Sequence, residues 1–212
     1  MEQTSSGVLP LAALRGLIKE ELIPNINLGE TDKFLESGVN RLMSMQTESG
    51  GFGYWPGNTK PHEEGTLYAM AALTVAKLNG FDVPEKPLEK AISFLKKNIY
   101  SINYNPYNLA FANYILSLNG ALDSWGIERN ISSYSNINYE SQYFWLLADH
   151  HSKNYSQGKS EKIWEENKPS HPFSRVIYGD FQTQYRGEAI ALLAATAYSK
   201  NEKLLHIPGQ WG

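Results

Sequence analysis

Apolar residues return every three to four positions along most of this chain, which is the period of an α-helix that buries one face. The clearest case is residues 31–46, where the recurring apolar positions are Phe34, Leu35, Val39, Leu42 and Met43. No stretch alternates apolar and polar residues cleanly enough to predict a strand of a sheet. The sequence therefore predicts an all-α fold.

Turn-forming residues divide the pattern into segments. Seven longer helices are predicted at about residues 5–22, 31–46, 63–79, 85–99, 106–119, 139–151 and 183–199, with shorter ones near 121–129 and 160–167. Thr31 is expected to cap the second helix, and Asn79-Gly80 is expected to close the third. On the first helix, the expected buried face is formed by Leu9, Ala12, Ala13, Gly16 and Leu17.

The predicted helices also pair. The helices at 5–22 and 63–79 are rich in small residues, and each is followed by a more charged helix. Small-residue helices suit a closely packed inner layer, and helices rich in Lys and Glu suit a solvated outer layer. Returns of roughly 33–45 residues lie within the range of helical repeats, so we expect an array of helical hairpins that forms either an open solenoid or a ring.

Composition excludes several kinds of function. The 212 residues carry a formal net charge of −3, which gives no electrostatic reason to expect a nucleic-acid partner. The chain contains no Cys, so disulfides, thiolate metal sites and Cys nucleophiles are excluded within it. No apolar run is long enough to span a membrane, and the first residues do not have the pattern of a signal peptide. The five His residues show no metal-ligand spacing, and we expect neither a metal nor a cofactor.

A loop rich in Gly and aromatic residues follows the second predicted helix, with the sequence MQTESGGFGYWPG at residues 45–57. Its glycines allow positive φ and close approach of the backbone, and Gln46 can hydrogen-bond the loop backbone or stack on Trp55. The loop is interpreted first as a structural connection between hairpins. The alternative is that Tyr54 and Trp55 form the wall of a functional pocket.

This arrangement resembles the α/α-toroid proteins, in which helical hairpins form two concentric layers. A helix ending in Leu-x-x-x-Gln is followed by Gly-Gly-Phe-Gly-x-Trp and an Ala-rich helix. Two branches of that superfamily are relevant: the terpenoid cyclases, and the thioester domain of the α2-macroglobulin and complement family. The cyclases would need an acidic Asp-x-Asp-Asp cluster, and this chain has none.

The macroglobulin branch has a Cys-x-Glu-Gln motif, and Met1-Glu2-Gln3-Thr4 is similar to its last part. Residues 5–17 and 42–84 are similar to the helices that follow it in bacterial α2-macroglobulins. The resemblance implies that residues 1–212 are a single partial toroid domain, with an incomplete ring, truncated at both ends relative to the family. The Cys of the motif would precede Met1 and is not present, so the chain as given cannot form the bond.

The resemblance further implies the chemistry of an internal thioester, in which the Cys sulfur is acylated by the side chain of Gln3. Glu2 would be a neighbour that shapes the site, and Tyr54 and Trp55 would shield it. His62, just before the third helix, is a candidate for assisting acyl transfer, or else an exposed loop residue.

The family traps proteases covalently, so the resemblance implies an endopeptidase-inhibitor module rather than an enzyme. Its partners would be target proteases and the remaining macroglobulin domains, and its location the periplasm or the bacterial cell surface. Two alternatives stay open: an α/α-toroid enzyme, either cyclase-like or polysaccharide-degrading, and a non-catalytic toroid that binds a partner protein. A polysaccharide-degrading enzyme would need paired carboxylates, for which the inner helices offer Glu64, Glu140, Asp149 and Glu188.

Overall fold

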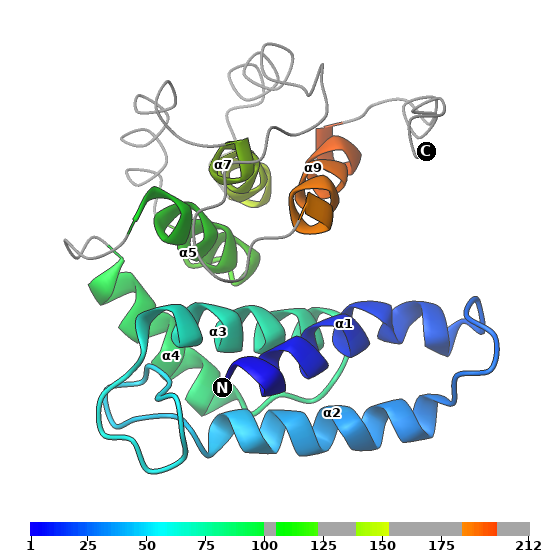
Figure 1. Ribbon diagram of the computed structural model, residues 1–212, viewed down its shortest axis with the longest axis horizontal. Helices are drawn as coiled ribbons and strands as arrows, with labels where there is room; N and C mark the ends of the chain where they lie inside the picture. The colour runs from blue at the N-terminus through cyan, green and yellow to red at the C-terminus, as the bar shows by residue number, and fades with distance from the viewer. Residues whose placement is uncertain (100–104, 123–138, 153–183, 199–212) are drawn as a thin grey trace. The chain divides into compact units, whose positions relative to one another are not determined.

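The computed structural model describes residues 1–99, 105–122, 139–152 and 184–198 (Figure 1). Seven helices are described: α1 (Glu2–Lys19), α2 (Leu28–Met43), α3 (Glu63–Leu78), α4 (Glu85–Asn98), α5 (Pro106–Leu118), α7 (Tyr139–His151) and α9 (Gln184–Tyr198). Within these residues the extended structure is a single antiparallel bridge between Gln46 and Phe52. The all-α prediction is confirmed. The chain forms two compact units, Met1–Asn103 and Tyr104–Gly212, which are described separately.

In the first unit, α1 packs against both α2 and α3, and α4 contacts α3. Helix α3 is the most buried of the four, since ten of its 16 residues are buried, among them a run of small residues. By contrast, α4 buries only Leu88, Ala91 and Leu95 and presents its Lys and Glu residues to solvent. The expected division into small-residue inner helices and charged outer helices therefore holds for α3 and α4. It does not hold for α1 and α2, which bury four residues each.

The second unit is built around α7, which packs against α5 on one side and α9 on the other. Residues 143–149 of α7 are all buried, because the helix is covered by both neighbours. Aromatic rings fill the contact between α5 and α7: Phe144 lies against Tyr107, Phe111 and Tyr114, with ring centroids 4.8–5.7 Å apart. Such offset and edge-on pairs are the preferred geometries of aromatic packing.

The boundaries of the later helices agree closely with those predicted, but the first two helices begin earlier. Helix α1 begins at Glu2, and α2 begins at Leu28 because Asn27 is its N-cap. The side chain of Asn27 accepts a hydrogen bond from the backbone N–H of Glu30 at 3.1 Å. The prediction of Thr31 as the cap was wrong: Thr31 lies buried in the first turn and donates to the carbonyl of Asn27.

The predicted buried faces were partly wrong. Helix α1 buries Ser5, Val8, Ala12 and Ile18, whereas Leu17 is exposed, and Phe34 of α2 is 68% exposed. Periodicity fixes which residues share a stripe but not how the helix is rotated against its neighbours. The short helix expected near 160–167 lies outside the described residues, as does nearly all of the one near 121–129.

Candidate functional site at the start of helix α1

The loop between α2 and α3 is held by a dense set of backbone hydrogen bonds. Thr47 N–H donates to the carbonyl of Gly51 at 2.8 Å, Gly53 N–H to Met45 at 2.8 Å, and His62 N–H to Phe52 at 2.8 Å. Gln46 donates from Nε2 to the carbonyls of Gly50 and Pro87, at 3.0 and 2.8 Å. The expectation that Gln46 bonds the loop backbone is confirmed, and the same side chain ties the loop to the start of α4.

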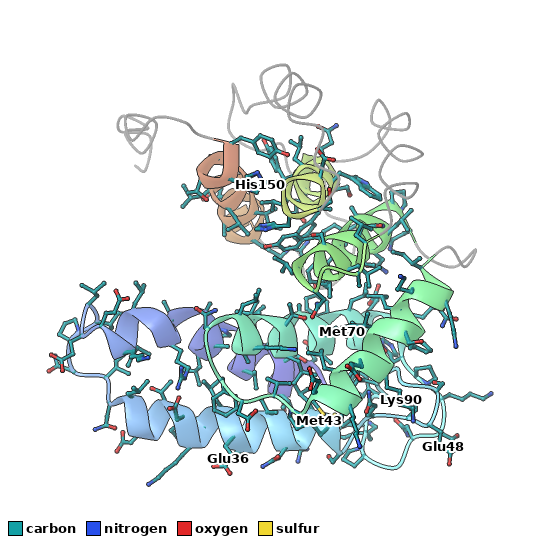
Figure 2. All side chains as sticks on the ribbon, turned by 180° about the vertical axis from the view of Figure 1, so that it is seen from behind. Glu36, Met43, Glu48, Met70, Lys90 and His150 are labelled. Atoms are coloured by element: carbon teal, nitrogen blue, oxygen red, sulfur yellow. The ribbon has the colours of Figure 1, made fainter. Side chains whose placement is uncertain are left out.

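The glycines of this loop are needed where the chain passes other backbone. Gly50 has φ +101°, and a Cβ there would lie 2.5 Å from the carbonyl oxygen of Lys90. Lys90 is labelled on α4 in Figure 2. A Cβ on Gly51 would lie 2.7 Å from Pro61 and 2.8 Å from the ring of Phe94. These contacts leave no room for a side chain, so the loop lies directly on α4.

The loop between α2 and α3 therefore packs on α4, and it also positions the start of α3. His62 is the N-cap of α3: its Nδ1 accepts a hydrogen bond from the backbone N–H of Gly65 at 3.0 Å. An acceptor nitrogen carries no proton, so the neutral ring in this arrangement carries its proton on Nε2. The side chain of His62 is exposed, but the ring serves as a helix cap rather than as a loop residue without a role.

The first turn of α1 lies against this same place. The terminal amine of Met1 donates to the carbonyl of Tyr54 at 3.1 Å, and the hydroxyl of Tyr54 donates to Glu2 Oε2 at 3.4 Å. The Tyr54 ring is edge-on to the His62 ring, with centroids 5.5 Å apart. Two segments about fifty residues apart in sequence, the start of α1 and the loop before α3, therefore meet at Tyr54.

Four of the five predicted site residues lie together in this place. Glu2, Tyr54 and His62 are joined by the contacts above, and the Trp55 ring is edge-on to that of Tyr54 at 5.5 Å between centroids. Trp55 is nonetheless 58% exposed and Tyr54 37% exposed. Gln3 is exposed on the next position of α1. Within the described residues, this is an open surface site rather than a closed pocket.

Two residues that the sequence interpretation did not single out complete the site. Gly65 is buried beneath Met1, and a Cβ there would lie 3.1 Å from Met1 Cγ and 3.2 Å from His62 Nδ1. Thr66 fixes Phe52 of the loop through its hydroxyl. The signal for Gly65 was its place in the first turn of a helix, where a glycine weakens the helix unless something packs close to it.

The described residues give no support for a metal site, since they contain no group of three or more His, Cys, Asp or Glu that could hold an ion. Two of the carboxylates considered for an enzyme have other surroundings in the structure. Glu140 forms an ion pair with Arg186 at 2.7 Å, and Arg186 lies over the ring of Tyr107 at 5.0 Å. Asp149 is buried within α7. No helix in the described part of the chain has the length and apolarity needed to cross a membrane.

Comparisons with known proteins agree with the family resemblance of the sequence. No family model matches the chain. The α2-macroglobulin of Xylella fastidiosa (strain Temecula1 / ATCC 700964) is 33% identical over 101 residues, which make up 47% of this chain and 6% of that protein. The chain thus spans a small part of the length of this relative.

Solved structures of bacterial α2-macroglobulins share the fold. Trypsin-activated α2-macroglobulin from Escherichia coli matches with a TM-score of 0.73 at 18% identity, over 95% of this chain and 15% of that one. The Salmonella protein reacted with methylamine matches with a TM-score of 0.70 at 19% identity, over 92% and 14%. A native Escherichia coli structure from domain MG7 to the C-terminus matches at 0.69 and 20%, over 92% and 33%.

Fold and site together define an all-α array of helical hairpins whose first helix starts against a Gly- and aromatic-rich loop. Bacterial α2-macroglobulins contain this fold within a much longer chain, and the resemblance to a partial α2-macroglobulin domain is confirmed.

Proposed function

We propose that this chain is the thioester-domain part of an α2-macroglobulin-like protease trap. The observation that carries the proposal is that Met1 and Glu2, the first residues of the Met1-Glu2-Gln3 turn, are held by Tyr54 of the loop that precedes α3. A motif of the form Cys-x-Glu-Gln needs its first helical turn held in a defined geometry, because the Cys sulfur and the Gln3 carboxamide must meet. The chain as given has no Cys and is not reactive.

In the proposed reaction, the thiol sulfur of a Cys preceding Met1 attacks the side-chain carbonyl carbon of Gln3. The C–N bond of the carboxamide breaks, and ammonia leaves with the proton of the thiol. A nucleophile on a protease later attacks the same carbonyl carbon and releases the thiol. The protease is then covalently joined to the side-chain carbonyl of Gln3. The module would thus be a stored acyl donor of an endopeptidase inhibitor, and not an enzyme with turnover.

The partners proposed are target proteases and the other macroglobulin domains of a longer protein. The place of action proposed is the periplasm or the cell surface, as for bacterial members of the family. The comparisons support this kind of protein, because the solved relatives are described as trypsin-activated, elastase-activated or reacted with methylamine.

The test begins with the codon that precedes Met1 in the gene. A Cys there, followed by the release of one free thiol when the longer protein is treated with methylamine, is the expected result. The matched control is the same protein with Gln3→Glu, which cannot lose ammonia and should release no thiol. A Ser at that position, or a Cys that stays titratable before methylamine is added, would exclude the thioester and leave a non-catalytic module that binds a partner protein.

A further inference from the structure

The contacts of Tyr54 assign this residue a role that shielding alone does not explain. Its backbone carbonyl accepts from the Met1 nitrogen at 3.1 Å, and its hydroxyl donates to Glu2 Oε2 at 3.4 Å. One residue of the loop thus holds two successive residues of α1, one through its backbone and the other through its side chain. A residue that only covered a site would need apolar contact and no hydrogen bonds to the covered turn.

Tyr54 is itself held from the side of α3. Its ring lies edge-on to His62, whose Nδ1 caps α3. His62 is in turn fixed by donation of its backbone N–H to the carbonyl of Phe52 at 2.8 Å. The phenol ring therefore contacts a residue that is hydrogen-bonded through both its ring and its backbone. Gly65 leaves the space that Met1 needs to approach the first turn of α3.

We infer that Tyr54 is a positioning residue, which clamps the first turn of α1 to the capped start of α3 and so sets the direction of the Gln3 side chain. This inference rests on the proposed function where it concerns Gln3, while the clamp itself concerns only contacts within the chain. A clamp of this kind raises the fraction of molecules in which the Cys sulfur can reach the Gln3 carbonyl carbon.

The clamp predicts a measurable local stability. The backbone N–H of Ser5 donates to the Met1 carbonyl at 3.0 Å, so its hydrogen exchange reports opening of the first turn of α1. In the 212-residue chain, Tyr54→Ala is expected to speed exchange at Ser5 by about threefold to tenfold, the effect of losing one modest hydrogen bond and its ring packing. Tyr54→Phe, which removes only the hydroxyl, should have a smaller effect in the same direction.

Two further variants separate the parts of the clamp. His62→Asn keeps a good N-cap but removes the ring that supports Tyr54, so it should also speed exchange at Ser5. Lys60→Ala is the matched control, because Lys60 is exposed in the same loop. Ser5 exchange in both Tyr54 variants within twofold of the Lys60→Ala chain would overturn the clamp. Should Tyr54→Ala not fold, the Tyr54→Phe and His62→Asn chains decide the question.

The effect on chemistry is read in the longer protein that carries the Cys. A positioning residue controls how many molecules form the thioester, and a shielding residue controls how fast a formed thioester reacts with methylamine. Tyr54→Phe is expected to lower the fraction of molecules that have lost ammonia, measured by intact mass, by about twofold or more relative to Lys60→Ala. An unchanged fraction with a faster methylamine reaction would overturn positioning in favour of shielding.

The two failures can be told apart. If the parent protein forms no thioester, the proposed function fails and with it the role toward Gln3, while exchange at Ser5 still decides whether Tyr54 clamps α1. If the parent protein forms the thioester and Tyr54→Phe changes neither its fraction nor the exchange of Ser5, the proposed function stands and this inference fails.

Discussion

The hydroxyl of Thr66 binds both backbone polar groups of Phe52. Its Oγ1 accepts from the Phe52 N–H at 2.9 Å and donates to the Phe52 carbonyl at 3.3 Å, and both residues are 0% exposed. The Phe52 carbonyl also accepts from the His62 backbone N–H, but the buried Phe52 N–H has Thr66 as its acceptor, so a helix side chain supplies what a neighbouring strand supplies in a sheet. This pair fixes the loop onto α3 and thereby sets the position of Tyr54.

Replacing Thr66 by Val should therefore destabilise the chain more than its small change in shape suggests. Val has almost the same volume but leaves the Phe52 N–H without a partner, which costs about 1–3 kcal/mol. Thr66→Ser keeps the hydroxyl and should cost clearly less. Urea denaturation of the two variants gives the comparison, and equal losses would show that the hydroxyl is not the source of the stability.

The glycines of the loop offer a second comparison with an internal control. Gly50 and Gly57 both have positive φ, +101° and +82°, but only Gly50 has backbone within reach of an added Cβ. Gly57→Ala should cost about 1–2 kcal/mol from the left-handed backbone alone. Gly50→Ala should cost clearly more, because the Cβ would meet the Lys90 carbonyl. Similar free energies of unfolding for the two variants would contradict the close approach of the loop to α4.

Arg15 joins three segments of the first unit. Its guanidinium binds both carboxylate oxygens of Asp32 in α2, at 2.7 and 3.0 Å, and donates to the carbonyl of Asn79 at the end of α3, at 2.9 Å. The hydrogen bond to Asp32 raises the pKa of Arg15, so the charge is retained throughout the practical pH range.

Arg15→Lys keeps the charge but cannot make the forked contact and reach the carbonyl together, so we expect a loss of about 1 kcal/mol. The control is Arg41→Lys, the same exchange at an exposed position of α2, which should change stability by less than about 0.5 kcal/mol. The measurement is thermal or urea unfolding of both variants. If Arg15→Lys unfolds like the control, the forked contact adds no stability.

A pH dependence is expected from the His pair that ends α7. Burial and the neighbouring His150 lower the pKa of His151 from its ordinary 6.5, and its ring faces Tyr114 of α5 with centroids 6.0 Å apart. Figure 2 shows His150 beside α9, where its ring lies 5.4 Å from that of Tyr198. Burial raises the pKa of Tyr114 to about 12, so that phenol stays neutral and provides no countercharge.

The unfolded chain therefore binds a proton at His151 more readily than the folded chain does. The stability that this difference provides is fully present above the ordinary pKa and is lost as the pH falls below it toward the lowered value. Between about pH 7.5 and 5.5, the free energy of unfolding should decrease more for the parent chain than for His151→Gln. An NMR titration that places the pKa of His151 at or above that of a free His would contradict this prediction.

The sequence predicted the later helices well because their ends carry strong local signals. Pro106, Asn79-Gly80 and the residues around His62 end or begin helices through their own backbone preferences, and the structure begins α5 and ends α3 where they lie. The predicted start of α2 was wrong because Asn27 and Thr31 are both good N-cap residues. The tertiary contacts that bury Thr31 decide between them. The exposed side chain of Phe34 shows that the sequence also did not determine which face of α2 is buried.

Local residue preferences thus determined by themselves that the chain is an all-α array of small-residue and charged helices, since helix period and capping act over a few residues. The tertiary structure decided that Tyr54 contacts both Glu2 and His62, because these residues come from segments that meet only when α1 packs beside α3. It also decided that Gly65 matters. A glycine in sequence shows only that a side chain is missing, and the space it leaves has meaning only once Met1 occupies it.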